Sequence, residues 1–340
     1  MRSSKPFAAP VLLGFLVSGC AGNPVPKPAA PTAVALPQPR VEKMREPLEV
    51  TPLELHFSGL RGVTKASESV AIKNAGSEAA QVSEIRVVGT DAGTFQILDV
   101  PLLPVVLQSG TSFSFLVGFE PTADAEPGVH HARVRIVRTE DDDGPPCDLT
   151  GLVTRGTGAS DEPSLQQILE ALGYDVDVGS KTLKLPAEPS PLGDEIKAPL
   201  FQRAKPGSVG FYLIARYTGG EASSFGYYLV ENNKPVAKLI GGAARGHNQS
   251  LNPELEGESQ TSFDPGDLAF GLYLKVGKRT LYSDNKLNSA ARLHLARAFP
   301  LRSRGRTQVQ DAYVVAFDED GDSDFQDHVF MLWNAKPAQE

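Results

Sequence analysis

Short runs of alternating apolar and polar residues dominate the part of the chain that follows residue 46. The first such run places Leu53, Leu55 and Phe57 on one face, and a later one does the same with Val134 and Ile136. Clusters of Gly, Asn, Pro and Ser separate the runs, as expected for tight turns. About seven short strands at this spacing predict an antiparallel β-sandwich over residues 47–155.

The alternating pattern of apolar and polar residues ends at a short linker, residues 156–162. Leu165, Ile168, Leu169 and Leu172 then recur at helical spacing, with Pro163 before the run and a glycine after it. This spacing predicts one short helix. Gly-rich apolar strands follow, and residues 289–298 fit either a second short helix or a strand. We therefore expect a mainly β protein whose second domain, residues 163–336, is a β-sandwich or jelly-roll-like module with one or two short helices.

The N-terminal residues predict export and a lipid anchor. Arg2 and Lys5 precede an apolar run that is too short to span a bilayer, as in a signal peptide over residues 1–19. The run ends in Val17-Ser18-Gly19-Cys20, which resembles the bacterial lipobox. That resemblance implies acylation of Cys20, and Ala21 at the sorting position favours the outer membrane of the cell envelope. The Pro-rich residues 20–46 are typical of an extended tether.

Composition narrows the set of partners. The chain has 33 Lys plus Arg and 41 Asp plus Glu, a formal net charge of −8, which argues against nucleic acid as a ligand. Its 32 glycines and 27 prolines suit turns and linkers. Cys147 has no second cysteine to pair with once Cys20 carries lipid, and we interpret it as a structural residue because no candidate base lies nearby in the sequence.

Residues 53–152 carry a family resemblance. The Asn-x-Gly after the second predicted strand and the Phe-x-Pro at Phe119-Glu120-Pro121 are its most specific marks. The segment is similar to immunoglobulin-like repeats of the ASPM/SPD-2/Hydin type, which also occur in bacterial surface proteins. The resemblance implies a spacer or protein-binding unit without chemistry of its own.

One segment concentrates acidic residues between two apolar runs. Six carboxylates lie within ten residues, and they repel one another unless water or a cation screens them. A hard dication with oxygen ligands, calcium above all, would turn this repulsion into a folded loop. The EF-hand pattern is not met, and a solvated acidic turn is the alternative. The predicted calcium ligands are Asp318, Asp320, Asp322, Asp324 and Asp327.

The same segment resembles the end of a bacterial domain family of unknown function found in secreted and surface proteins. In that family an acidic F-E-D step and a D-x-D-[FY]-x-D stretch lead into the last strand. Here the first step reads Phe317-Asp318-Glu319-Asp320, so an aspartate replaces the usual glutamate. The resemblance extends upstream to Phe263 and to residues 270–273 and 282–288, and its acidic loops suggest calcium or sugar binding. Glu319, Asp284 and Asn288 are secondary ligand candidates, although an Asx-turn is the better explanation of the last two.

These features predict a membrane-anchored lipoprotein that acts as a non-enzymatic binding or adhesion module on a glycan or protein partner. No nucleophile elbow, zinc-protease motif or phosphate-binding loop occurs in the sequence. Two alternatives remain open. One is a hydrolase of polysaccharide or cell wall that uses paired carboxylates, which would need acids on two sides of a cleft. The other is a scaffold protein of the envelope.

Overall fold

Strands make up most of the structure, which is a computed structural model. It describes residues 48–338 except 140–141, 157, 159, 187–190, 233, 245 and 290–293. The prediction of a mainly β protein is confirmed. The predicted signal peptide, the lipidation site Cys20 and the Pro-rich tether lie outside the described residues. Within the described part, no helix has the length and apolar character needed to cross a membrane.

Nine of the first eleven strands form the two sheets of a sandwich, and β4 and β7 pair as a small separate sheet. One sheet has the order β1-β3-β8-β6, and the other has the order β10-β9-β11-β2 with β5 added on β9. Alternate residues point into one core, so Val70 and Ile72 of β3 are as fully buried as Val134 and Ile136 of β9. The strands are β1 (Leu48–Thr51), β2 (Glu54–Leu60), β3 (Ala66–Asn74), β4 (Ala80–Val82), β5 (Glu84–Val88), β6 (Phe95–Leu98), β7 (Val105–Leu107), β8 (Ser112–Phe119), β9 (Gly128–Thr139), β10 (Asp142–Asp143) and β11 (Cys147–Thr154).

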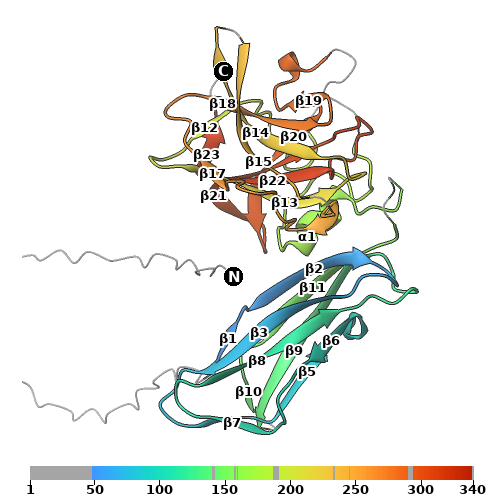
Figure 1. The fold of residues 1–340 in the computed structure, drawn as a ribbon, viewed down its shortest axis with the longest axis vertical. Coiled ribbons are helices and arrows are strands. Elements are labelled where there is room, and N and C mark those ends of the chain that lie inside the picture. The colour runs from blue at the N-terminus through green and yellow to red at the C-terminus, as the bar shows by residue number, and fades with distance from the viewer. Residues whose placement is uncertain are drawn as a thin grey trace, which may run out of the picture. The chain divides into compact units, whose positions relative to one another are not determined.

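The remaining strands build two further sheets, coloured yellow to red in Figure 1. One has the order β15-β14-β18-β12-β23 with β19 on β18, and the other has the order β16-β13-β22-β21-β20 with β17 on β13. Their bounds are β12 (Phe201–Arg203), β13 (Val209–Tyr217), β14 (Ser223–Glu231), β15 (Lys234–Gly242), β16 (Gln249–Leu251), β17 (Ser262–Phe263), β18 (Phe270–Val276), β19 (Arg279–Tyr282), β20 (Ala296–Ser303), β21 (Thr307–Phe317), β22 (His328–Trp333) and β23 (Ala335–Pro337).

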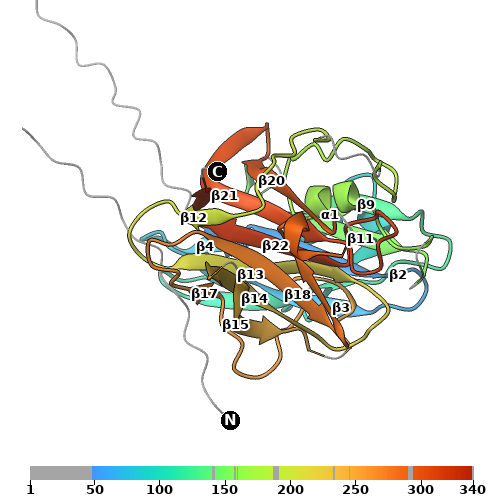
Figure 2. The ribbon, with the colours of Figure 1, turned by 90° about the horizontal axis from the view of Figure 1, so that it is seen from above.

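The sheet that contains β13, β22 and β21, which run side by side in Figure 2, is buried on both faces. Val315 and Phe317 of β21 face the other sheet, whereas Val314 and Ala316 face a second apolar cluster on the opposite side. Burial on both faces explains why this strand reads as a continuous apolar run in the sequence. Both strands that flank the acidic loop therefore belong to a rigid central layer.

The second apolar cluster is covered by the helix α1 (Leu165–Ala171) and the chain that follows it. The predicted helix is confirmed, and Ser164 and Gln167 form a capping box at its start. The predicted stretch 289–298 is partly outside the described residues, and its last part begins β20. A short 3-10 helix η2 (Asn285–Leu287) precedes it, and another, η1 (Ala92–Thr94), precedes β6.

Candidate functional site

The acidic loop connects two neighbouring strands of the central sheet. It covers residues 318–327, and the pair formed by Phe317 and His328 closes it at its base. Phe325 turns inward with a positive φ of 58° and is buried in the apolar cluster beside α1. The Arg297 guanidinium lies 4.8 Å from the centre of its ring. The loop is therefore anchored in the core and does not stand out from the surface.

Asp318 organises the first turn of the loop. Its Oδ1 accepts hydrogen bonds from the backbone N–H groups of Gly321, at 2.6 Å, and Asp322, at 3.2 Å. Its Oδ2 accepts one from Ser323 N–H at 2.8 Å. Gly321 and Ser323 both have positive φ angles, so the chain coils tightly around this carboxylate. Backbone donors thus hold the turn in place.

Three carboxylates of the loop converge. Asp318, Asp322 and Asp324 each offer an oxygen, and these oxygens lie within 4.8 Å of one another. Asp318 is 2% exposed and Asp324 is 3% exposed, whereas Asp322 is half-buried. Asp324 Oδ1 has no hydrogen-bond partner among the described residues. A buried carboxylate oxygen without a donor is costly, and this group can hold a metal ion.

The electrostatics of the three carboxylates reflect their crowding. Burial raises the pKa of Asp324 to about 8, and the neighbouring carboxylates of Asp322 and Asp318 add to the shift. Burial also raises the pKa of Asp318, although its three backbone hydrogen bonds oppose the effect. The Lys184 ammonium lies 3.2 Å from Asp322 Oδ2 and is largely exposed. A divalent cation among these oxygens would reverse the repulsion that favours protonation.

Two residues that the sequence did not single out support the cluster. Gln326 is fully buried, and its Nε2 donates to Asp324 Oδ2 at 3.1 Å and to Glu162 Oε2 at 2.8 Å. Glu162 comes from the linker before α1. Burial raises the pKa of Glu162, and the carboxylate of Asp322 raises it further. A fourth acidic group therefore lies beside the three aspartates, from a segment 160 residues earlier in the chain.

The other half of the loop faces a different partner. Asp327 Oδ2 accepts a hydrogen bond from Glu319 N–H at 2.6 Å, and Glu319 Oε1 accepts one from Thr218 Oγ1 at 2.6 Å. Burial raises the pKa of Asp327 to about 10, with further increments from the carboxylates of Asp324 and Glu319. The guanidinium of Arg216, only 1% exposed, acts electrostatically on both acids. Here the fold supplies its own buried cation.

His328 completes this second group. Its Nε2 lies 2.8 Å from Ser223 Oγ, and its Nδ1 lies 3.6 Å from Glu319 Oε2. Burial lowers the pKa of His328 well below its ordinary value, and Arg216 lowers it further, so the ring is neutral. Ser223 is 5% exposed, so its hydroxyl group has little access to solvent. The group is a buried polar network beneath the loop.

The remaining predicted ligands have other partners. Asp320 is exposed and pairs with Arg279 NH1 at 2.6 Å. Asp284 Oδ1 accepts from Lys286 N–H at 2.9 Å at the start of η2. Asn288 exchanges two hydrogen bonds with the backbone of Tyr282. The structure thus gathers three of the five predicted ligands, with Asp320 and Asp327 turned elsewhere, and it uses Asp284 and Asn288 as turn-forming groups.

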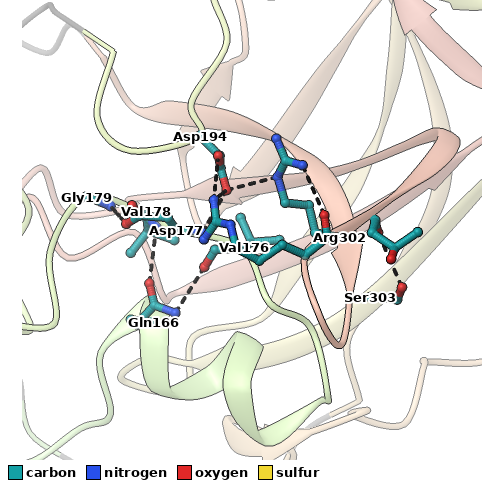
Figure 3. Close-up of polar contacts among 10 residues, drawn as sticks. Gln166, Val176, Asp177, Val178, Gly179, Asp194, Arg302 and Ser303 are labelled. Carbon is teal, nitrogen blue, oxygen red and sulfur yellow. Dashed lines mark hydrogen bonds and ion pairs between the residues drawn. The ribbon is translucent and has the colours of Figure 1, made fainter.

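A cleft of about 770 Å³ lies where the chain after α1 approaches the turn between β20 and β21. The carboxylate of Asp194 joins its two walls. Asp194 Oδ2 accepts from Asp177 N–H at 3.0 Å and from Arg302 Nε at 3.1 Å, and both of its oxygens accept from Arg306 NH2. Figure 3 shows Asp194 with Asp177 and Arg302, and Gln166 of α1 bonded to the backbone of Val176 and Val178.

The same contacts set the charge state of Asp194. Burial alone would raise its pKa, but the Asp177 N–H and the two guanidinium groups outweigh burial and lower it. Arg302, Arg304 and Arg306 form a basic cluster at the turn between β20 and β21. Two of them, Arg302 and Arg306, pair with Asp194 and not with the acidic loop. Arg304 approaches Asp148 Oδ2 at 3.8 Å. No local sequence pattern marks Asp194, because its two arginine partners lie more than a hundred residues away.

Comparisons with known proteins carry little weight for this chain. No family model matches it, and no curated protein matches it. The two family resemblances of the sequence therefore stay predictions.

Solved structures are similar only at low TM-scores. A PapD-like domain of human CEP192 has a TM-score of 0.24 and 13% identity, covering 37% of this chain and 98% of that one. A protein of unknown function from Porphyromonas gingivalis has a TM-score of 0.27 and 10% identity, covering 77% and 96%. The secreted serine protease VesC from Vibrio cholerae has a TM-score of 0.24 and 12% identity, covering 84% and 49%. Scores this low do not support an argument about function.

Proposed function

We propose that this chain is a lipid-anchored protein of the bacterial envelope whose C-terminal sheets form a non-enzymatic binding module stabilised by calcium. The observation that carries the proposal is the convergence of Asp318, Asp322 and Asp324, with a buried Asp324 Oδ1 that lacks a donor. Carboxylate oxygens on a tightly turned loop are suitable ligands for a hard cation.

Calcium suits this loop better than magnesium or zinc. The donor set is made only of oxygens, whereas zinc prefers sulfur and nitrogen ligands. His328, the imidazole that follows the loop, belongs to the Arg216 network. Magnesium requires near-octahedral geometry and keeps most of its water, whereas calcium accepts six to eight oxygens in irregular arrangements. Three carboxylates plus water and backbone carbonyls meet that requirement.

The proposed lipid anchor and the proposed binding partner rest on the sequence alone. Cys20 would carry the lipid, the Pro-rich residues 20–46 would act as a tether, and the immunoglobulin-like sandwich would act as a spacer. The C-terminal sheets would then present a ligand-binding surface to a glycan or a protein. An outer-membrane location fits Ala21 at the sorting position.

Calorimetric titration of the mature chain with calcium tests the metal site. We expect one site per chain and a rise in melting temperature with calcium, because a ligand that binds only the native state stabilises it. Asp324→Asn should abolish both signals, since it removes the buried charge while keeping the side chain's shape.

Asp320→Asn is the matched control. It lies in the same loop and makes the same chemical change, but its carboxylate pairs with Arg279 outside the cluster. Calcium binding should survive in this variant. Absence of heat and of any melting shift in the unmodified chain would rule out the site.

A further inference from the structure

The cleft beside α1 is large enough for a small-molecule or oligosaccharide ligand. Its volume of about 770 Å³ falls inside the range of roughly 300–1,000 Å³ that is usual for ligand sites. Nothing in the proposed metal site explains it, because the three converging aspartates do not line it.

The lining favours polar ligands. Val176 is the only aliphatic residue among the described lining residues apart from three glycines, and its side chain is buried in the core, so Tyr174 and His131 supply the ring surfaces of the cleft. Protein partners and hydrophobic ligands need an apolar centre to bind against. A ligand of this cleft would therefore gain most of its affinity from hydrogen bonds.

The charges of the lining point to a neutral ligand. Three acidic residues, Glu170, Asp175 and Asp177, face three basic ones, Lys181, Arg304 and Arg306. An anionic polymer would meet the carboxylates, and a cationic ligand would meet the guanidinium groups. Sugar hydroxyl groups can donate to carboxylates and accept from guanidinium groups at the same time, so a neutral saccharide suits both sets.

Arg304 is an available donor of the cleft. Its side chain is 53% exposed, and the nearest carboxylate oxygens, on Asp148 and Glu54, lie at 3.8 and 4.0 Å. These distances are too long for hydrogen bonds. Arg306, in contrast, is committed to Asp194.

The segment that forms one wall of the cleft contacts the acidic loop a few residues further along the chain. Residues 173–181 line the cleft, and four residues later Leu185 N–H donates to Ser323 O at 2.7 Å. Lys184 of the same segment lies 3.2 Å from Asp322. Leu185 and Phe325 share an apolar cluster with Val176 and Val178. A cation that fixes the loop would therefore also fix this wall.

We propose that the cleft binds a neutral oligosaccharide and that it does so in a calcium-dependent manner. The calcium dependence rests on the proposed metal site, whereas the cleft itself is an independent feature of the fold. The wall formed by residues 173–186 is the physical link between the two.

The test is calorimetric titration of the mature chain with a panel of neutral hexasaccharides: cellohexaose, xylohexaose, mannohexaose, maltohexaose and chitohexaose. We expect at least one to bind in calcium. Arg304→Ala and Glu170→Gln should each weaken that binding tenfold or more. Both residues are exposed, so the variants should fold, and their melting temperatures check this. Arg203→Ala, which removes a guanidinium paired with Asp264 and Asp267 away from the cleft, should leave binding unchanged.

Repeating the titration after chelation separates this inference from the proposed function. We expect the affinity for the hexasaccharide to fall tenfold or more without calcium. Calcium heat with unchanged sugar affinity would overturn the inference and leave the metal site standing. Sugar binding without calcium heat would overturn the metal site and the calcium dependence together. Failure of every hexasaccharide, or binding that ignores both cleft variants, would rule out the cleft as a sugar site.

Discussion

The two halves of the acidic loop treat their carboxylates in different ways. The charge of Arg216, a buried guanidinium, acts on Asp327 and Glu319, and each of these two acids also accepts a hydrogen bond. Asp318, Asp322 and Asp324 converge on one another, and the exposed Lys184 pairs with Asp322. The sequence of the loop does not distinguish the two groups, because all five acids lie within ten residues.

This difference shows that a carboxylate's role depends on whether the fold brings a cation to it. Where a strand residue such as Arg216 supplies the charge, the acids serve the structure. Where carboxylates instead converge on one another, their repulsion favours protonation and an external ion can relieve it. The following variants test the comparison, from the largest expected effect to the smallest.

Replacing the internal cation should have the largest effect. Arg216→Met leaves Glu319 buried without the guanidinium that favours its ionised form, and loss of one partner of a buried ionic group costs about 3–5 kcal/mol. We expect the free energy of unfolding to fall by this amount, measured by urea denaturation. Calcium should not restore it, since the ion would bind the other half of the loop. If the free energy of unfolding stayed the same within error, Arg216 would not act as a counter-charge in this part of the loop.

The converging half should make stability depend on pH when calcium is absent. The pKa of Asp324 is raised from 3.8 to about 8 by burial and by its neighbours. The folded protein therefore holds a proton that the unfolded chain has lost, so stability falls as pH rises between these values. His328 affects stability in the opposite direction. Because its pKa is lowered in the folded protein, its contribution makes stability fall as pH decreases below 6.5, the ordinary value, and it has no effect above that pH.

The window between pH 6.5 and 8 thus isolates the acids. Urea midpoints of the unmodified chain should decline across this window in chelator, and Asp324→Asn should show a shallower decline. Asp327, whose pKa is raised to about 10, should maintain a residual slope in both proteins. Equal slopes would contradict the assignment of this shift to Asp324.

The exposed cation should matter less than the buried one. Lys184→Met removes an ion pair whose lysine is 59% exposed, and exposed pairs contribute below about 1 kcal/mol. The same change removes a positive charge next to Asp322, so calcium affinity should rise a few-fold at low salt. Calorimetry at two salt concentrations measures both effects, and a loss of affinity would mean that Lys184 positions the site.

Asp320→Asn should have the smallest effect. Its carboxylate is 67% exposed and pairs with a partly exposed Arg279. Substitutions of this kind usually change stability by less than about 0.5 kcal/mol. Thermal melts with and without calcium should overlay those of the unmodified chain, and a calcium-specific difference would extend the cluster to Asp320.

The strand pattern was predictable because it depends on local periodicity. Alternation around Val70 and Val134 and the helical spacing from Leu165 reflect which side chains the core must bury. Pairing across the sheets was not predictable in this way. The parallel pairing of β2 with β11 joins residues almost a hundred positions apart, and no turn residue indicates it.

The site was predictable only in part, for the same reason. The density of acids marked the loop, but which oxygens converge depends on the positive φ angles at Gly321, Ser323 and Phe325, and these set the direction of each side chain. Glu162, Arg216 and Asp194 reach their partners through the tertiary fold. Local sequence carries no signal for such contacts.

The hydrogen bonds that Asp318 accepts have a consequence for the order of events. Because three backbone N–H groups hold the turn at Asp318, this first turn can form before any ion arrives, and an ion would then fix the rest of the loop and the segment that contacts it. Formation of this turn would then not depend on the ion content of the surrounding medium. Loading and release would be limited by the exchange of water around the ion and not by refolding of the chain, so occupancy could follow the medium on a short timescale.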